Sequence, residues 1–147
     1  MGQDKYCTQW AAQFRVASDL SRRGYRVSLT LGNAESTDLS ALSPGGRLCD
    51  LEVKGLAKQN FWLVRERKAR DDLFFILVLS PRAKFNSHAL TLGAPRFFIA
   101  SSSEVMAKIA SLREHTVRRG KKWNANGSGF SWRSALEFED RWNILPA

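Results

Sequence analysis

Two acidic side chains and a lysine have the types and spacing that metal-dependent hydrolysis requires. Two of them lie in the segment 49–54, Cys-Asp-Leu-Glu-Val-Lys. If this segment is a strand, its alternate side chains point the same way. Glu52 and Lys54 then share one face about 7 Å apart, from a rise of about 3.3 Å per residue. The apolar residues of the segment face the other side, towards a core.

Asp38 is expected beside this pair. The turn Ser43-Pro-Gly-Gly is of the kind that joins neighbouring antiparallel strands, so the segment 38–42 should pair with 47–55. Asp38 then lies near Glu52, and two carboxylates repel each other unless a cation such as Mg²⁺ joins them. A bound metal polarises a phosphoryl group and lowers the pKa of an attacking water, while Lys54 can orient that water. The pattern favours phosphodiester hydrolysis.

The elements that must position these residues follow from periodicity. Apolar residues at intervals of three and four, among them Trp10 and Phe14, predict an amphipathic helix over 5–23. A second helix should start near Ser101, where the spacing is that of a capping box, and end near Gly120. Strands are predicted at 25–31, 38–42, 47–55, 73–79 and 95–100. The segment 61–70 fits either a short strand or the entry to a helix. Together these elements predict an α/β fold around a mixed sheet.

Thr37-Asp38-Leu39, followed by Leu51-Glu52-Val53-Lys54-Gly55, resembles the PD-(D/E)xK signature of the restriction-endonuclease-like superfamily. That superfamily includes small Holliday-junction resolvases. The resemblance spans roughly residues 8–100 and implies an αβββαβ core with a mixed sheet flanked by helices. It also implies that Mg²⁺ or Mn²⁺ is held by Asp38, Glu52 and the Val53 carbonyl, with Lys54 positioning the water.

The sequence departs from this signature at two positions. Thr37 stands where the signature has proline. Many members of the superfamily carry a glutamate on the first helix that completes the metal shell, and here the corresponding residue is Gln13. An amide oxygen can ligate a hard cation but adds no charge, so metal affinity would be lower. Gln13 is therefore expected to assist in catalysis, or else to mark a weakened site.

The charge balance points to a polyanionic partner. There are 23 Lys and Arg residues against 14 Asp and Glu, which gives a net charge of +9 and a pI near 10.2. Nucleic acid is the first candidate partner, although positive charge also keeps small proteins soluble. Two cationic clusters are predicted to hold its backbone: Arg65, Arg67, Lys68 and Arg70, then Arg118, Arg119, Lys121 and Lys122. The alternatives are a solvated face for the first cluster and, for the second, cations that stabilise a helix C-terminus.

Length and composition limit the remaining possibilities. A chain of 147 residues with 44% hydrophobic residues suits a single domain, 1–147, with 121–147 as a C-terminal tail packed on the core. We expect a cytoplasmic protein, since the sequence suggests neither a secretory signal nor a membrane span. Cys7 and Cys49 show no zinc-ligand spacing, and both are expected to be buried.

These observations predict a nuclease that acts on DNA with a divalent metal. One alternative is a catalytically weakened or inactive nucleic-acid-binding module on the same fold. The other is a protein-interaction domain whose charge is incidental. A homodimer is possible, because two copies of such a site can address two strands.

Overall fold

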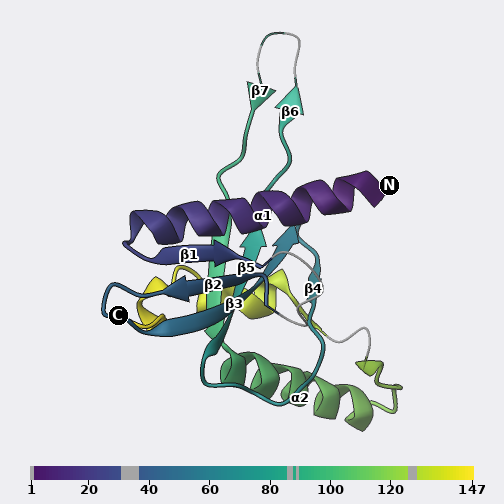
Figure 1. The fold of residues 1–147 in the computed structure, drawn as a ribbon. Helices are drawn as coiled ribbons and strands as arrows, with labels where there is room; N and C mark the ends of the chain where they lie inside the picture. Colours follow the sequence, from purple (N-terminus) through teal and green to yellow (C-terminus); the bar gives the residue numbers. More distant parts are fainter. Residues whose placement is uncertain (1, 31–36, 86–87, 89, 126–128) are drawn as a thin grey trace.

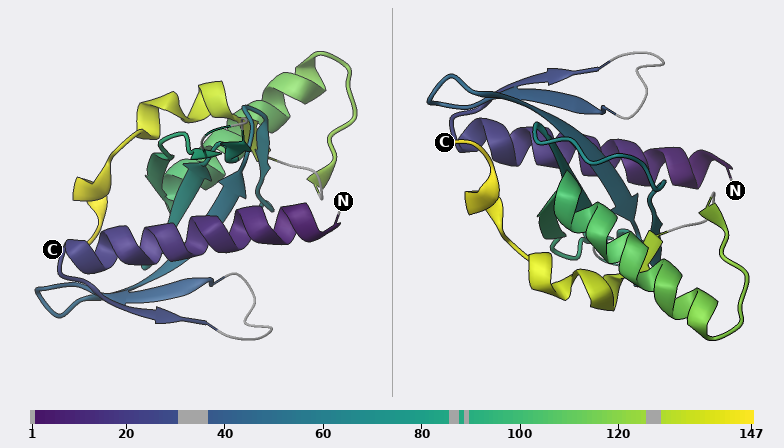
Figure 2. Two further views of the ribbon diagram at one scale, coloured as in Figure 1. Left: turned by 90° about the horizontal axis from the view of Figure 1, so that it is seen from above. Right: turned by 90° about the horizontal axis from the view of Figure 1, so that it is seen from below.

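A computed structural model describes residues 2–30, 37–85, 88, 90–125 and 129–147. The long helix α1 (Gly2–Arg22) lies along one side of the sheet, and α2 (Ser102–Arg118) lies on the other (Figures 1 and 2). α2 begins with the predicted capping box, in which the Ser101 and Glu104 side chains each bond the other residue's backbone N–H. Both predicted helices are therefore confirmed.

The main sheet has the strand order β1-β2-β3-β5-β8. Its strands are β1 (Arg26–Leu29), β2 (Leu39–Leu42), β3 (Leu48–Leu56), β5 (Leu73–Leu79) and β8 (Arg96–Ser101). β3 and β5 are parallel, whereas the other neighbours are antiparallel. The predicted α/β class with a mixed sheet flanked by helices is thus confirmed. Residue 31, at the end of the first predicted strand, lies outside the described residues.

Each face of this sheet carries its own core. Leu51 and Val53 of β3 pack with Ala12, Val16 and Leu20 of α1 on one face. On the other face, alternate residues of β5 and β8 pack against α2. β5 is buried along its whole length, as expected for a central strand covered on both sides. Residues 52 and 54 of β3 therefore turn towards the α2 side, as strand alternation predicts.

The apolar face of α1 differs from the expected one. Ala12, Val16 and Leu20 are fully buried, whereas Trp10 and Phe14 remain 44% and 54% exposed. The reason is close packing at Gly55, where an added Cβ would lie 2.9 Å from both the Ala12 Cβ and the Thr8 carbonyl oxygen. Only a small side chain such as Ala12 fits opposite Gly55, whereas Trp10 and Phe14 lie on the other face of the helix, where their rings stack with centroids 5.3 Å apart.

The ambiguous segment 61–70 begins as a strand and then becomes irregular. β4 (Phe61–Leu63) pairs with β9 (Gly129–Ser131), and 64–70 has no regular secondary structure. Residues 57–72 are all described, and none of them is helical. The helix that covers this side of the sheet is α2, which comes after β8 instead of between β3 and β5.

Four further elements complete the described chain. β6 (Lys84–Phe85) and β7 (Leu90–Thr91) form an arm that projects beyond α1 (Figure 1). The 3₁₀ helices η2 (Trp132–Phe138) and η3 (Trp142–Ile144) run beside β8, where the Trp142 ring lies 5.2 Å from that of Phe97. Among the described residues, no helix is both long enough and apolar enough to cross a membrane.

Candidate metal-binding and catalytic site

Asp38 lies at the point where β2 begins beside β3. Its backbone N–H donates to the Leu51 carbonyl at 3.0 Å, which continues the β2–β3 ladder by one bond. Its Oδ2 accepts a hydrogen bond from the Val53 N–H at 2.8 Å, and its Oδ1 accepts one from Gln13 Nε2 at 3.0 Å. The structure thus brings Gln13 of α1 into contact with Asp38, while its predicted part in catalysis stays a prediction.

The pKa of Asp38 is raised above its usual value. Burial is the largest cause, and the negative charge of Glu52 raises the pKa further. The hydrogen bond from Val53 and the positive charge of Lys54 act in the opposite direction without cancelling the rise. Asp38 bonds the N–H of Val53, the residue between Glu52 and Lys54, so the three residues lie along one stretch of the β2–β3 pair.

Glu52 is a buried carboxylate held between two cations. The residue is only 4% exposed. Its Oε1 lies 3.0 Å from Lys54 Nζ, and its Oε2 pairs with Arg67 Nη2. The pair between Glu52 and Lys54 follows from their placement on one strand face, but that face is covered instead of exposed. A buried charge requires such partners, because its removal from water is otherwise costly.

Arg67 contacts a site carboxylate, a role that the sequence did not reveal. Its guanidinium lies 5.2 Å from the centre of the Phe75 ring, and its backbone N–H donates to Met106 Sδ at 3.3 Å. Its Nε is buried and has no hydrogen-bond partner among the described residues. Arg67 therefore reaches the site from the irregular segment 64–70, where no periodicity indicates the direction of a side chain.

The other predicted nucleic-acid contacts divide into two groups. Arg70 pairs with Asp50 and Asp72 at 2.8 and 2.9 Å, so Asp50 is not simply solvated. The rest are exposed and form no ion pair within the described parts of the chain: Arg65, Lys68, Arg118, Arg119, Lys121 and Lys122. The last four lie at the end of α2 and just beyond it, away from the start of β2 (Figures 1 and 2). Their role in nucleic-acid binding stays a prediction.

Gln9 is a site residue that sequence reasoning missed. Its Nε2 donates to the Val53 carbonyl at 2.7 Å, and its Oε1 accepts from the Gly55 N–H at 3.0 Å. The Gln9 carboxamide thus pairs with β3 where β2 is absent, as a neighbouring strand would. A signal was available, because Gln9 lies one helical turn before Gln13 and shares its face.

The donor set of this region suits a hard divalent cation. Asp38 and Glu52 offer carboxylate oxygens, Val53 offers a carbonyl and Gln13 an amide oxygen. The described residues contain no group of three or more His, Cys, Asp or Glu that could hold a metal ion. Two carboxylates still fit Mg²⁺, which usually keeps several waters and takes other ligands from substrate phosphates.

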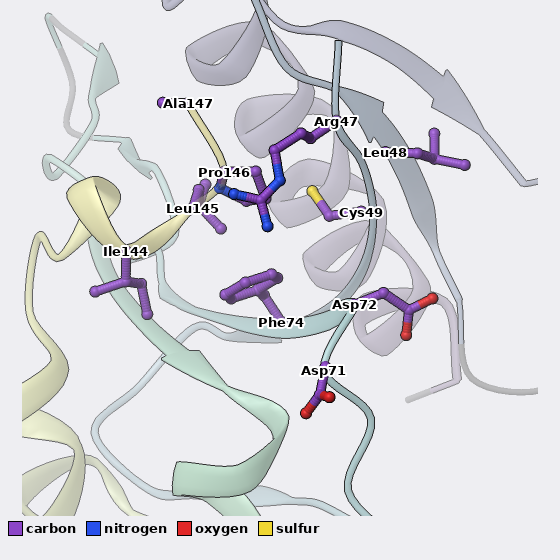
Figure 3. A pocket seen from close by; sticks show the side chains of 10 residues that line it. All are labelled: Arg47, Leu48, Cys49, Asp71, Asp72, Phe74, Ile144, Leu145, Pro146 and Ala147. Carbon is purple, nitrogen blue, oxygen red and sulfur yellow. The ribbon is translucent and has the colours of Figure 1, made fainter. Parts of the chain in front are cut away.

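A separate pocket at the opposite end of β3 is lined by none of Asp38, Glu52, Lys54 and Gln13. It has a volume of about 330 Å³ and lies between the starts of β3 and β5 and the C-terminal segment (Figure 3). Cys49 lines it, and burial, followed by the charges of Asp50 and Asp72, raises the pKa of its thiol to about 11. Cys49 is therefore a poor nucleophile at neutral pH. It is buried as predicted, whereas the prediction for Cys7 was wrong because that residue is exposed.

The fold, a five-stranded mixed sheet flanked by helices, is an endonuclease-like α/β fold. Among solved structures, the chain is similar to a bacterial homing endonuclease, I-Ssp6803I, with a TM-score of 0.53 and 13% sequence identity. The similarity covers 95% of this chain and 90% of that one. No family model matches the sequence, and no curated protein matches it significantly. The structural likeness establishes the fold.

Proposed function

We propose that the protein is a divalent-metal-dependent endonuclease of the PD-(D/E)xK type that acts on DNA. The observation that carries this proposal is the hydrogen bond at 2.8 Å from the Val53 N–H to Asp38 Oδ2, because Val53 stands between Glu52 and Lys54 in β3, whose Oε1 and Nζ atoms lie 3.0 Å apart. The likeness in fold to a homing endonuclease and the net charge of +9 support the same substrate class.

Each side chain of the site has a distinct role in this proposal. Asp38, Glu52 and the Val53 carbonyl would hold Mg²⁺ or Mn²⁺. The bound ion would polarise a phosphoryl group of the substrate and lower the pKa of a water molecule. Lys54, whose side chain is 35% exposed, reaches solvent and orients the attacking water. Gln13 fixes the orientation of Asp38, and Arg67 offsets the charge of Glu52. The exposed cations bind the DNA backbone, and a homodimer would present two such sites to the two strands.

Cleavage assays on plasmid and branched DNA test the proposal. Cleavage should require Mg²⁺ or Mn²⁺ and should be lost in Lys54→Ala, Glu52→Gln and Asp38→Asn. Asp50→Asn is the matched control, because Asp50 lies on the same strand and face but pairs with Ser40 and Arg70. Cleavage that persists in Lys54→Ala refutes the assigned chemistry.

The second candidate is a nucleic-acid-binding module with a weakened site. The observation that favours it is the contact of Gln13 with Asp38, because many members of the superfamily have glutamate at the position of Gln13. Gln13→Glu adds a carboxylate and should tighten Mn²⁺ binding measured by calorimetry. If the unmodified protein binds DNA without cutting it and Gln13→Glu restores cutting, the weakened site is the correct description.

A further inference from the structure

A second pocket adjoins Lys54, on the side of the site that faces the N-terminal half of α1. Its volume is about 580 Å³, within the range of small-molecule sites. Three elements build its walls, namely α1, β3 and β4. Its lining includes Lys5, Tyr6, Gln9, Lys54, Phe61 and Leu63.

The walls of this pocket present large apolar side chains to solvent. Tyr6 is 71% exposed, Phe61 is 59% exposed and Leu63 is 60% exposed. Tyr6 comes from α1 and Phe61 from β4, so two elements each contribute an exposed ring to the lining. Exposed aromatic faces are the usual platforms for unpaired nucleobases, since every base has a π-face.

Positive charge flanks the rings. Lys5 and Lys54 both line the pocket, and Lys54 also contacts the carboxylate of Glu52 at 3.0 Å. A strand whose phosphate lies at Lys54 would therefore place a neighbouring base beside the rings. Aromatic faces combined with cations suit a single nucleotide better than a purely apolar partner, because a nucleotide offers both a base for the rings and a phosphate for the lysines.

The pocket is fixed by contacts on each of its walls. The Gln9 carboxamide bonds to Val53 and Gly55 of β3 at 2.7 and 3.0 Å. Phe61 lies on β4, which is paired with β9, and its neighbour Trp62 is 1% exposed. A preformed pocket loses little conformational entropy on binding, so stacking inside it adds to affinity.

We propose that this pocket receives one unpaired nucleotide of a DNA strand that lies next to the bond cut at the site. The inference rests on the proposed function for the identity of the strand. A base inside an intact duplex is stacked and cannot present its faces to Tyr6 and Phe61, so the pocket selects DNA with an unpaired nucleotide. Base–aromatic stacking corresponds to roughly a 5- to 150-fold gain in affinity.

Binding of two matched DNAs tests this selection. One is a fully paired duplex, and the other carries a single unpaired 2-aminopurine in the same sequence. Without divalent metal, anisotropy should show tighter binding of the second by the factor given above, and 2-aminopurine emission should fall as the base stacks. Equal affinities, or emission that does not change on binding, would overturn the proposal.

Substitutions identify the pocket as the source of the preference. Tyr6→Ala and Phe61→Ala should each bring the affinity ratio of the two DNAs towards one, while Tyr6→Phe should keep it. Phe14→Ala is the control, because Phe14 is a 54% exposed ring on the same helix that does not line the pocket. Loss of the preference in Phe14→Ala alone, or its persistence in both pocket variants, contradicts the assignment.

Two further outcomes separate this inference from the nuclease proposal. A preference for the unpaired nucleotide without any cleavage supports the pocket and rejects the enzyme. Cleavage that ignores the unpaired nucleotide supports the enzyme and rejects the pocket. Sedimentation that shows a dimer which Tyr6→Ala and Phe61→Ala both dissociate would also reject the pocket, because a second copy would then cover these rings.

Discussion

Removal of the Arg67 charge should destabilise the protein because Glu52 is buried. We consider Arg67→Met, which keeps an unbranched side chain near Phe75 but removes the guanidinium. Loss of one partner of a buried ion pair typically costs about 3–5 kcal/mol. Two effects reduce this loss. Lys54 remains 3.0 Å from Glu52 as a partner. The substitution also removes the buried Arg67 Nε, whose lack of a hydrogen-bond partner costs about 1 kcal/mol or more in the unmodified protein. The net loss in the free energy of unfolding should then be about 2 kcal/mol.

Urea denaturation and thermal unfolding measure this loss. For a chain of this size, a loss of about 2 kcal/mol lowers Tm by about 4–8 °C. Glu52→Gln and the double variant complete a thermodynamic cycle, in which the coupling of the two residues should exceed about 1 kcal/mol. A loss below about 0.5 kcal/mol together with negligible coupling would refute the reasoning, since it would mean that Glu52 is solvated instead of held by Arg67.

Three other perturbations test separate parts of the structure. Gly55→Ala places a Cβ 2.9 Å from the Thr8 carbonyl oxygen and should lower the free energy of unfolding in urea by about 1–3 kcal/mol; unchanged stability would contradict the tight packing of α1. Burial raises the pKa of Glu104, but hydrogen bonds from Ser101 and Arg141 outweigh it and leave the pKa lowered. Denaturation curves should therefore show the unmodified protein to be more stable than Glu104→Gln, with the full difference present above pH 4.5 and lost as the pH falls through the lowered pKa of Glu104. A difference that does not change with pH would contradict this. Replacement of the four cations after α2 by Gln should reduce the slope of log K against log salt by up to about 3.6 in DNA binding, and an unchanged slope would remove them from the interface.

The centre of the site was predictable because local rules determine it. The two-residue period of a strand places Glu52 and Lys54 on one face, and the turn at 43–46 brings Asp38 back beside them. The helical period likewise directs Gln13 towards the sheet. These residues are positioned by elements whose geometry is regular, so their spacing in the sequence carries the information.

The contacts that these residues make with the rest of the protein were harder to predict from the sequence. Arg67 lies on an irregular segment, and its contact with Glu52 depends on the path of the chain between β4 and β5. The exposure of Trp10 and Phe14 was also not predicted, because the choice of the Ala12 face as the buried one depends on the close approach of α1 to Gly55 of β3. Long-range packing of this kind is not encoded in local periodicity.

The carboxamide of Gln9 occupies hydrogen-bonding positions at the edge of β3 that a neighbouring strand would otherwise fill. Beyond the point where β2 starts, the N–H groups of Val53 and Gly55 and the Val53 carbonyl are held by the side chains of Asp38 and Gln9. A rotation of one glutamine side chain therefore exposes the Val53 carbonyl to an incoming ion without separating any pair of strands. Ligand exchange at this edge needs only a change of rotamer, and the sheet that supports the site stays intact.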